Sequence, residues 1–114
     1  MDCNWKAWTT AITAHKALRV GQRLLKALGA TNVSVHVQPY PKTNGHVLSF
    51  SMNVGRQPWV NGVVTVISIA QKVAGGWQLF GNISEELEMI SKRSTVTGVN
   101  MLSCSITRVA ASTE

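Results

Sequence analysis

The chain has 114 residues, the usual size of one domain and long enough to bury a core without staples. Charged residues make up only 14% of it, against about 25% in ordinary soluble domains, yet the net charge is +6. Two cysteines exclude a disulfide framework; we expect Cys3 and Cys104 to be free and buried, with one disulfide between them left open. The apolar run GVVTVISIA is too short to span a bilayer, so we expect no membrane partner.

Basic residues are spread along most of the chain, whereas the acidic residues lie near its ends. No carboxylate occurs between Asp2 and Glu85, while that interval holds eight Lys and Arg residues. Such a segment attracts polyanions through its summed field, whatever its fold. The distribution indicates nucleic acid as a partner, ahead of membrane surfaces and acidic proteins. The alternative is that the basic side chains only keep the protein surface hydrated and bind no specific partner.

Residues 4–28 are expected to form one long N-terminal helix, because they lack proline and end at Gly29, a suitable C-terminal cap. At about 100° per residue, one face becomes an apolar stripe with Leu25 at its centre, expected to be buried, and with Gly21 allowing close contact with a sheet. The opposite face holds Trp5, Trp8, Ile12, Lys16, Arg19, Arg23 and Lys26.

After Gly29 the hydrophobic period changes from that of a helix to two, the period of a half-buried strand. Ser84, the acidic residues after it and the basic residues at 92–93 predict a short helix over residues 84–93. The predicted strands are residues 33–38, 46–54, 63–73, 77–81 and 98–110. We therefore expect one α+β domain over residues 1–114: a long N-terminal helix packed on a four- to five-stranded antiparallel sheet, with a short helix before the last strand.

No arrangement of residues in the sequence predicts catalysis or metal binding. Acid–base chemistry needs carboxylates set apart across a pocket, but the internal acids are neighbours at 85–88. The histidines, His15, His36 and His46, have no thiol or carboxylate nearby in the sequence to complete a metal site. We therefore expect no catalytic residue, no metal and no cofactor, and we expect the protein not to be an enzyme.

A short segment is similar to a known inhibitor family. Residues 71–75, QKVAG, match the Q-x-V-x-G hairpin of the cystatins, whose fold also sets a long helix against an antiparallel sheet. In that family the hairpin enters a cysteine-protease cleft and a Pro-Trp hairpin follows it, whereas here Pro58 and Trp59 precede it. The resemblance implies a helix-on-sheet topology and keeps a small protein inhibitor among the alternatives.

The mixed aromatic and basic face of the expected helix has two interpretations. In the first, Trp5, Trp8 and Ile12 form a protein interface, which makes the protein a self-assembling structural subunit, viral or phage-like. In the second, the protein is a non-enzymatic nucleic-acid-binding protein for RNA or single-stranded DNA, acting as a homo-oligomer. We prefer this second interpretation. The first residues, MDCNWKAW, do not resemble a signal peptide, so we expect a cytoplasmic location, or host cytoplasm or a virion. The predicted nucleic-acid contacts are Lys16, Arg19, Arg23, Lys26, Arg56 and Trp59.

Overall fold

In the computed structural model, which describes residues 1–108, the chain begins with strand β1 (Asp2–Thr9) and not with a helix. The prediction of a single helix over residues 4–28 is therefore wrong in its first part. Cys3, Trp5 and Ala7 are buried and the residues between them are not, which is the period of two of a strand with one face on the core. Trp5 and Trp8 are three positions apart, a spacing that also fits a helix, and this coincidence caused the error.

Helix α1 (Ala14–Leu28) begins and ends at residues whose chemistry fixes those positions. The Thr13 side-chain oxygen accepts a hydrogen bond from the Lys16 amide at 3.2 Å, which caps the N-terminus. Gly29 ends the helix with φ 71°, in the left-handed region that glycine adopts freely, as the sequence predicted. Leu24 is fully buried, whereas Leu25 is only half-buried, so the helix is rotated slightly from the expected orientation.

The rest of the described chain contains one more helix and seven more strands. They are β2 (His36–Pro39), β3 (His46–Asn53), α2 (Trp59–Ala70), β4 (Ala74–Gly75), β5 (Gln78–Phe80), β6 (Glu86–Ser91), β7 (Arg93–Ser94) and β8 (Val99–Thr107). Strands β2, β3, β5 and β8 confirm four predicted strands, with small differences at their ends.

Two predicted elements have the wrong type. Residues 63–73 were expected to be a strand but belong largely to α2, whose buried positions, including Trp59, Val63 and Val66, recur every three or four residues. Burial of that face outweighs the low helix propensity of its β-branched residues. Residues 84–93 were expected to be a helix but contain β6, in which Leu87 and Met89 are buried and alternate with exposed glutamates.

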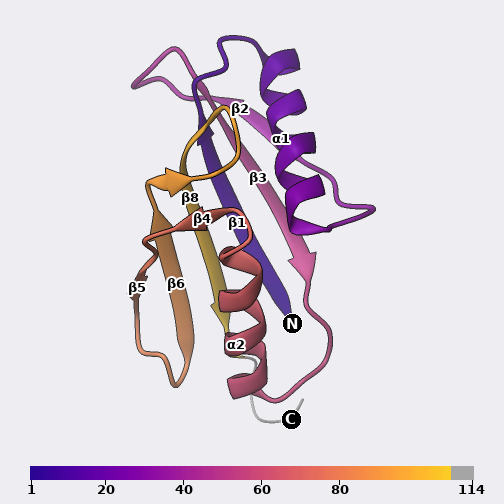
Figure 1. The fold of residues 1–114 in the computed structure, drawn as a ribbon, viewed down its shortest axis with the longest axis vertical. Helices are drawn as coiled ribbons and strands as arrows, with labels where there is room; N and C mark the ends of the chain where they lie inside the picture. The colour runs from indigo at the N-terminus through magenta and orange to yellow at the C-terminus, as the bar shows by residue number, and fades with distance from the viewer. Residues whose placement is uncertain (109–114) are drawn as a thin grey trace.

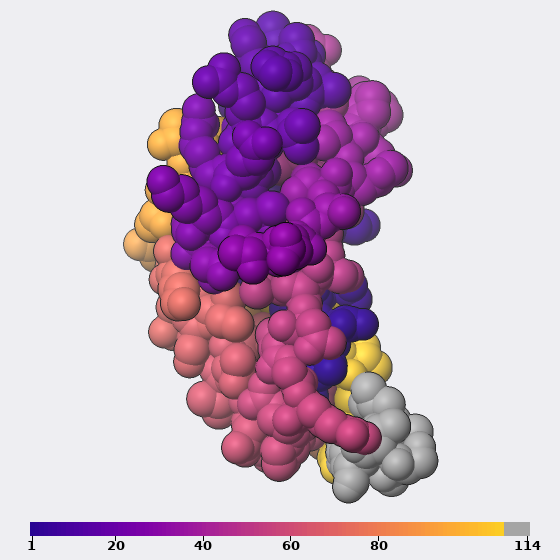
Figure 2. Space-filling view, turned by 90° about the vertical axis from the view of Figure 1, so that its right-hand side faces the viewer, coloured from indigo at the N-terminus to yellow at the C-terminus, as the bar shows by residue number. Residues whose placement is uncertain are grey.

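The main sheet has six strands in the order β2-β3-β1-β8-β6-β5, and every pairing in it is antiparallel. The α+β class and the antiparallel sheet are thus confirmed, and the sheet has more strands than expected. Both helices lie against one face of this sheet, with α1 over its upper part and α2 over its lower part (Figures 1 and 2). The other face carries no helix. No helix within residues 1–108 has the length and apolar character needed to cross a membrane.

The core lies between the sheet and the two helices and is centred on Trp5. The indole stacks on Phe50 with ring centroids 6.1 Å apart and meets Trp77 edge-on at 6.2 Å. Gly21 brings α1 close to β3, because a Cβ there would lie 3.3 Å from Leu48. Such close contact is what the sequence predicted for this glycine.

The two cysteines meet inside this core. Cys3 and Cys104 are free thiols on neighbouring strands, and their sulfur atoms are 3.0 Å apart in a hydrogen bond. The hydrogen bond with Cys3, together with burial, raises the pKa of the Cys104 thiol. That thiol therefore stays protonated and behaves as a small apolar side chain.

Candidate nucleic-acid interface

Three of the predicted phosphate-binding cations line one concavity at the beginning of α1. Lys16, Arg19 and Arg23 surround a groove of about 330 Å³, whose other walls come from Thr10, Ala11 and Val20. The cations share this groove because spacings of three and four residues place side chains on one side of a helix. Lys26 continues the same side in the last turn of α1, so the cationic edge from Lys16 to Lys26 is about 15 Å long. We call these four residues the basic face.

The basic face is available for an external anion. Among residues 1–108, the side chains of Lys16, Arg19 and Lys26 have no hydrogen-bond or ion-pair partner. Arg23 donates one hydrogen bond, from Nη1 to the Thr97 carbonyl oxygen at 3.3 Å, and a guanidinium has further donors to offer. The first turn of α1 contains no acidic residue. The positive end of the helix dipole therefore adds to the field of the side chains instead of being neutralised.

The acidic side chains of residues 1–108 lie away from the groove, toward the other end of the sheet. Asp2 begins β1, and Glu86 pairs with Thr107, which lies at the level of Asp2 because Asn4 pairs with Ser105. From Asp2 to Thr9 the strand rises about 23 Å, as seven steps of about 3.3 Å. The groove beside Thr10 is thus more than a Debye length, about 8 Å at physiological salt, from these carboxylates. No carboxylate of the described residues therefore lies close enough to neutralise the groove.

The backbone beneath the groove is held by the side chains of His46 and Thr9, for which the sequence predicted no such role. His46 is nearly buried, and its Nδ1 donates a hydrogen bond to the Ala11 carbonyl oxygen at 2.7 Å. The Thr9 hydroxyl donates to the His46 carbonyl oxygen at 3.0 Å. A Cβ on Gly45 would come within 2.1 Å of the Thr9 backbone carbonyl oxygen. The β2–β3 loop can therefore lie here only with glycine at this position. These contacts fix the segment that connects β1 to α1.

The remaining predicted site residues do not join the basic face. Trp59, one of the predicted nucleic-acid contacts, is only 5% exposed and its Nε1 donates to the Ile83 carbonyl oxygen at 2.7 Å, so this indole is buried and not available to a ligand. Arg56 is exposed in the loop before α2, which Figure 1 shows at the lower end of the molecule, away from the β1–α1 connection.

The three predicted interface residues are also separated. Trp5 is 1% exposed and belongs to the core, so its prediction as a surface residue is wrong. Trp8 is half-buried on the sheet face that has no helix, and Ile12 is 66% exposed in the segment before α1. They do not form one stripe, because β1 is a strand whose neighbouring side chains point to opposite faces.

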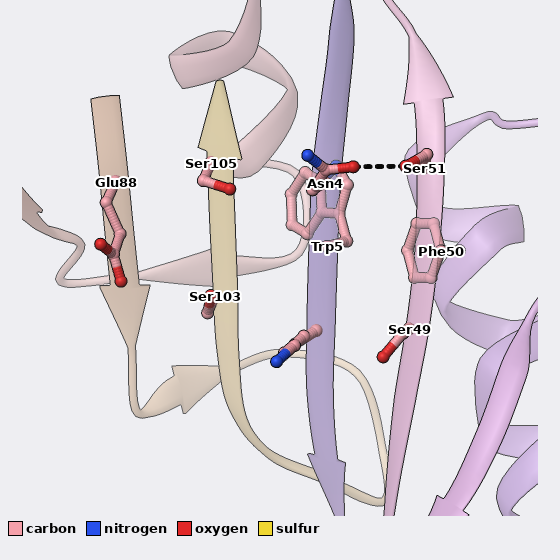
Figure 3. A pocket seen from close by; sticks show the side chains of 9 residues that line it. Asn4, Trp5, Ser49, Phe50, Ser51, Glu88, Ser103 and Ser105 are labelled. Carbon is pink, nitrogen blue, oxygen red and sulfur yellow. Dashed lines mark hydrogen bonds between the residues drawn. The ribbon is translucent and has the colours of Figure 1, made fainter. Parts of the chain in front are cut away.

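The uncovered face of the sheet is polar over most of its area. A shallow hollow of about 520 Å³ lies on it, lined mainly by serine hydroxyls, with one lysine and one glutamate (Figure 3). One cross-strand row runs from Ser51 through Asn4 and Ser105 to Glu88. The Ser51 hydroxyl donates to the Asn4 side chain within this row (Figure 3). Because the charges of Lys6 and Glu88 cancel, this part of the face does not favour a polyanion.

The character of this face changes at the end of β1. There Trp8 lies opposite Val47 on β3 and Met101 on β8, so an apolar row replaces the hydroxyl rows. Sequence reasoning identified Trp8 but not the residues that the fold places beside it, Tyr40, Lys92 and Asn100. Those three come from separate loops and strands, and no local pattern connects them.

The comparisons with known proteins found no matching family model, curated protein or solved structure. Within residues 1–108, no three His, Cys, Asp or Glu side chains come together in a way that could hold a metal ion.

Proposed function

We propose that this protein binds nucleic acid, as RNA or single-stranded DNA, through the basic face of α1, without catalysing a reaction. The observation that carries the proposal is that Lys16, Arg19 and Arg23 line one groove that begins at the positive end of a helix. Phosphate oxygens are the acceptors that such a set of donors fits, and backbone contacts of this kind supply most of the affinity for a strand.

The placement of the cations supports binding better than it supports folding. Lys16 lies in the first turn of α1, where a positive charge opposes the helix dipole and reduces stability. The side chains of Lys16 and Arg19 make no hydrogen bond or ion pair with the described residues that would offset this cost. A phosphate in the groove would relieve the repulsion, so the arrangement suits an anionic ligand.

Fluorescence anisotropy with a labelled single-stranded RNA of about 12 nucleotides tests the proposal. We expect the wild type to bind at about 50 mM salt, and the variant Lys16→Ala/Arg19→Ala to bind clearly more weakly. Both side chains are exposed and unpartnered, and Lys16 opposes the helix dipole, so the variant should be at least as stable to denaturant as the wild type. Absence of binding by the wild type would exclude the proposed function.

A second candidate, a self-assembling structural subunit, is favoured by a different observation. Val60 and Val64, one turn apart on α2, are 69% and 58% exposed, and α2 contains no charged residue. An apolar helix face of this kind suits a second copy of the chain. Light scattering without nucleic acid distinguishes the two candidates. A particle many times heavier than the 12.4 kDa chain, lost in the variant Val60→Lys/Val64→Lys, supports assembly.

A further inference from the structure

The apolar end of the uncovered sheet face contains a second concavity, close to the basic groove. This recess of about 280 Å³ approaches the size of small-ligand sites, which begin at roughly 300 Å³. Its lining combines two aromatic side chains, Trp8 and Tyr40, with a cation, an amide and a thioether from Lys92, Asn100 and Met101. Neither the serine rows below it nor the basic groove contains an exposed aromatic ring.

The two aromatic rings are free to receive a planar ligand. Trp8 and Tyr40 are each half-buried, and neither makes a ring contact with another aromatic side chain in residues 1–108. In contrast, Trp5 and Phe50 already stack on each other within the core. Trp8 and Tyr40 therefore have partly exposed rings that no other aromatic side chain of the described residues stacks against.

A β-bulge turns Asn100 toward the same recess. Trp8 pairs with Met101 and Thr9 pairs with Val99, so Asn100 is an extra residue on β8 with no partner on β1. A bulge of this kind redirects a side chain that regular pairing would have placed on the other face. An asparagine amide offers a donor and an acceptor together, which fits the edge of a nucleobase.

The recess and the basic groove open on opposite faces of the sheet, and their linings meet at the end of β1. Trp8 and Thr9 line the recess, whereas the next residues, Thr10 and Ala11, line the groove. A flexible strand that occupies both sites must therefore pass around the end of β1, where Thr9 and Thr10 are consecutive residues. The connection is fixed by the hydrogen bond between His46 and the Ala11 carbonyl oxygen.

We infer that the recess binds one unpaired nucleobase, stacked against Trp8 and Tyr40, while the phosphates of the same strand lie on the basic face. Asn100 contacts the edge of the base, and Lys92 contacts its flanking phosphate. The ligand is therefore a single strand, because a base inside a duplex is already stacked and paired and would have to leave the helix. This inference rests on the proposed function, since the basic face supplies the rest of the binding.

Intrinsic tryptophan fluorescence tests the stack directly, with an oligothymidylate of about 12 nucleotides and an abasic strand of equal length as the two probes. Trp5 and Trp59 are at most 5% exposed, so quenching by the thymidylate must come from Trp8 or Trp77. We expect the thymidylate to quench the wild type and the abasic strand to quench it much less. The variant Trp8→Phe should lose the quenching, whereas the matched variant Trp77→Phe should keep it.

Affinity gives a second measurement that does not depend on Trp8 alone. Tyr40→Ala and Trp8→Ala should each weaken thymidylate binding by roughly 5- to 150-fold, the range for loss of one base–aromatic stack, and leave abasic binding unchanged. Tyr40 lies just outside β2, so its replacement disturbs the sheet least. Equal affinity of the wild type for both strands, with quenching retained in Trp8→Phe, would overturn the base site and leave the proposed function standing. Failure of both strands to bind would overturn both proposals.

Discussion

Helices α1 and α2 lie on the same face of the sheet and differ in almost every property of their exposed sides (Figures 1 and 2). Helix α1 has a side-chain cap at Thr13, a glycine at its end and four exposed cations. Helix α2 begins after Pro58 with no side-chain cap, contains no charged residue and exposes Val60 and Val64. Both helices nevertheless bury one face in the same core.

This difference shows that the residues that stabilise a helix on this sheet are distinct from those on its exposed side. Burial is sufficient for α2, which forms from β-branched residues without a side-chain cap. The cations of α1 are therefore not needed to keep a helix on this sheet, and Lys16 opposes the helix dipole. We interpret the basic face as a surface retained for a ligand, and the following variants test that contrast.

The largest effect is expected in the buried face of α1. Leu24→Ala should lower the free energy of unfolding by about 2–5 kcal/mol, because a fully buried leucine leaves a cavity. Leu25→Ala, at a half-buried neighbour, should cost clearly less. Urea unfolding of the two variants measures the difference. Equal losses would mean that α1 is rotated from the orientation described.

Removal of the cap should have a smaller effect, and only on α1. Thr13→Ala deletes the oxygen that accepts from the Lys16 amide and should cost about 1 kcal/mol of stability. Thr13→Ser keeps that oxygen and serves as the matched control. Thermal unfolding followed by circular dichroism compares the two, and similar melting temperatures would argue against the cap.

Lys16 is expected to show opposite effects on stability and on binding. Lys16→Glu replaces an unfavourable charge in the first turn by a favourable one and should stabilise the protein by about 0.3–1 kcal/mol. The same change should weaken RNA binding, because it introduces repulsion within the basic face. Lys16→Gln, which only removes the charge, should fall between them on both measurements. Stronger binding by Lys16→Glu would contradict the account.

The smallest effect is expected on the outer side of α2. Val60→Ala and Val64→Ala should each change stability by less than about 0.5 kcal/mol, because both side chains are exposed. RNA affinity should not change, since α2 carries none of the proposed contacts. Denaturant titration and anisotropy on the same preparations check both statements. A marked loss of RNA affinity would move the binding surface from α1 to α2.

Elements whose pattern is local were predictable from the sequence. Gly29 marks the end of α1, and alternation at Leu48 and Phe50 identifies β3. The cations at Lys16, Arg19 and Arg23 could be grouped as well, because helical spacing alone brings them together.

Elements decided by distant contacts were not predictable in this way. Strand β1 is central, paired with β3 on one side and β8 on the other, and that pairing outweighs the helical spacing of Trp5 and Trp8. Glu86 and Glu88 fit the acidic first turn of a helix, which is why a helix was predicted here. In the structure they alternate with buried residues of a strand. The recess could not be predicted from the sequence either. Asn100 faces it because of a β-bulge, which is seen only in the strand register.

The salt dependence of RNA binding, measured for two variants of equal charge, tests the central claim most directly. Lys16→Ala/Arg19→Ala removes two cations of α1, and Arg56→Ala/Lys72→Ala removes two exposed cations that flank α2. Each phosphate contact to a single strand contributes about 0.7 to the slope of log affinity against log salt. We predict that the α1 variant loses roughly one to two units of slope and that the α2 variant keeps the wild-type slope. Equal losses in both variants would show that net charge, and not the basic face, attracts the RNA, and would contradict the account.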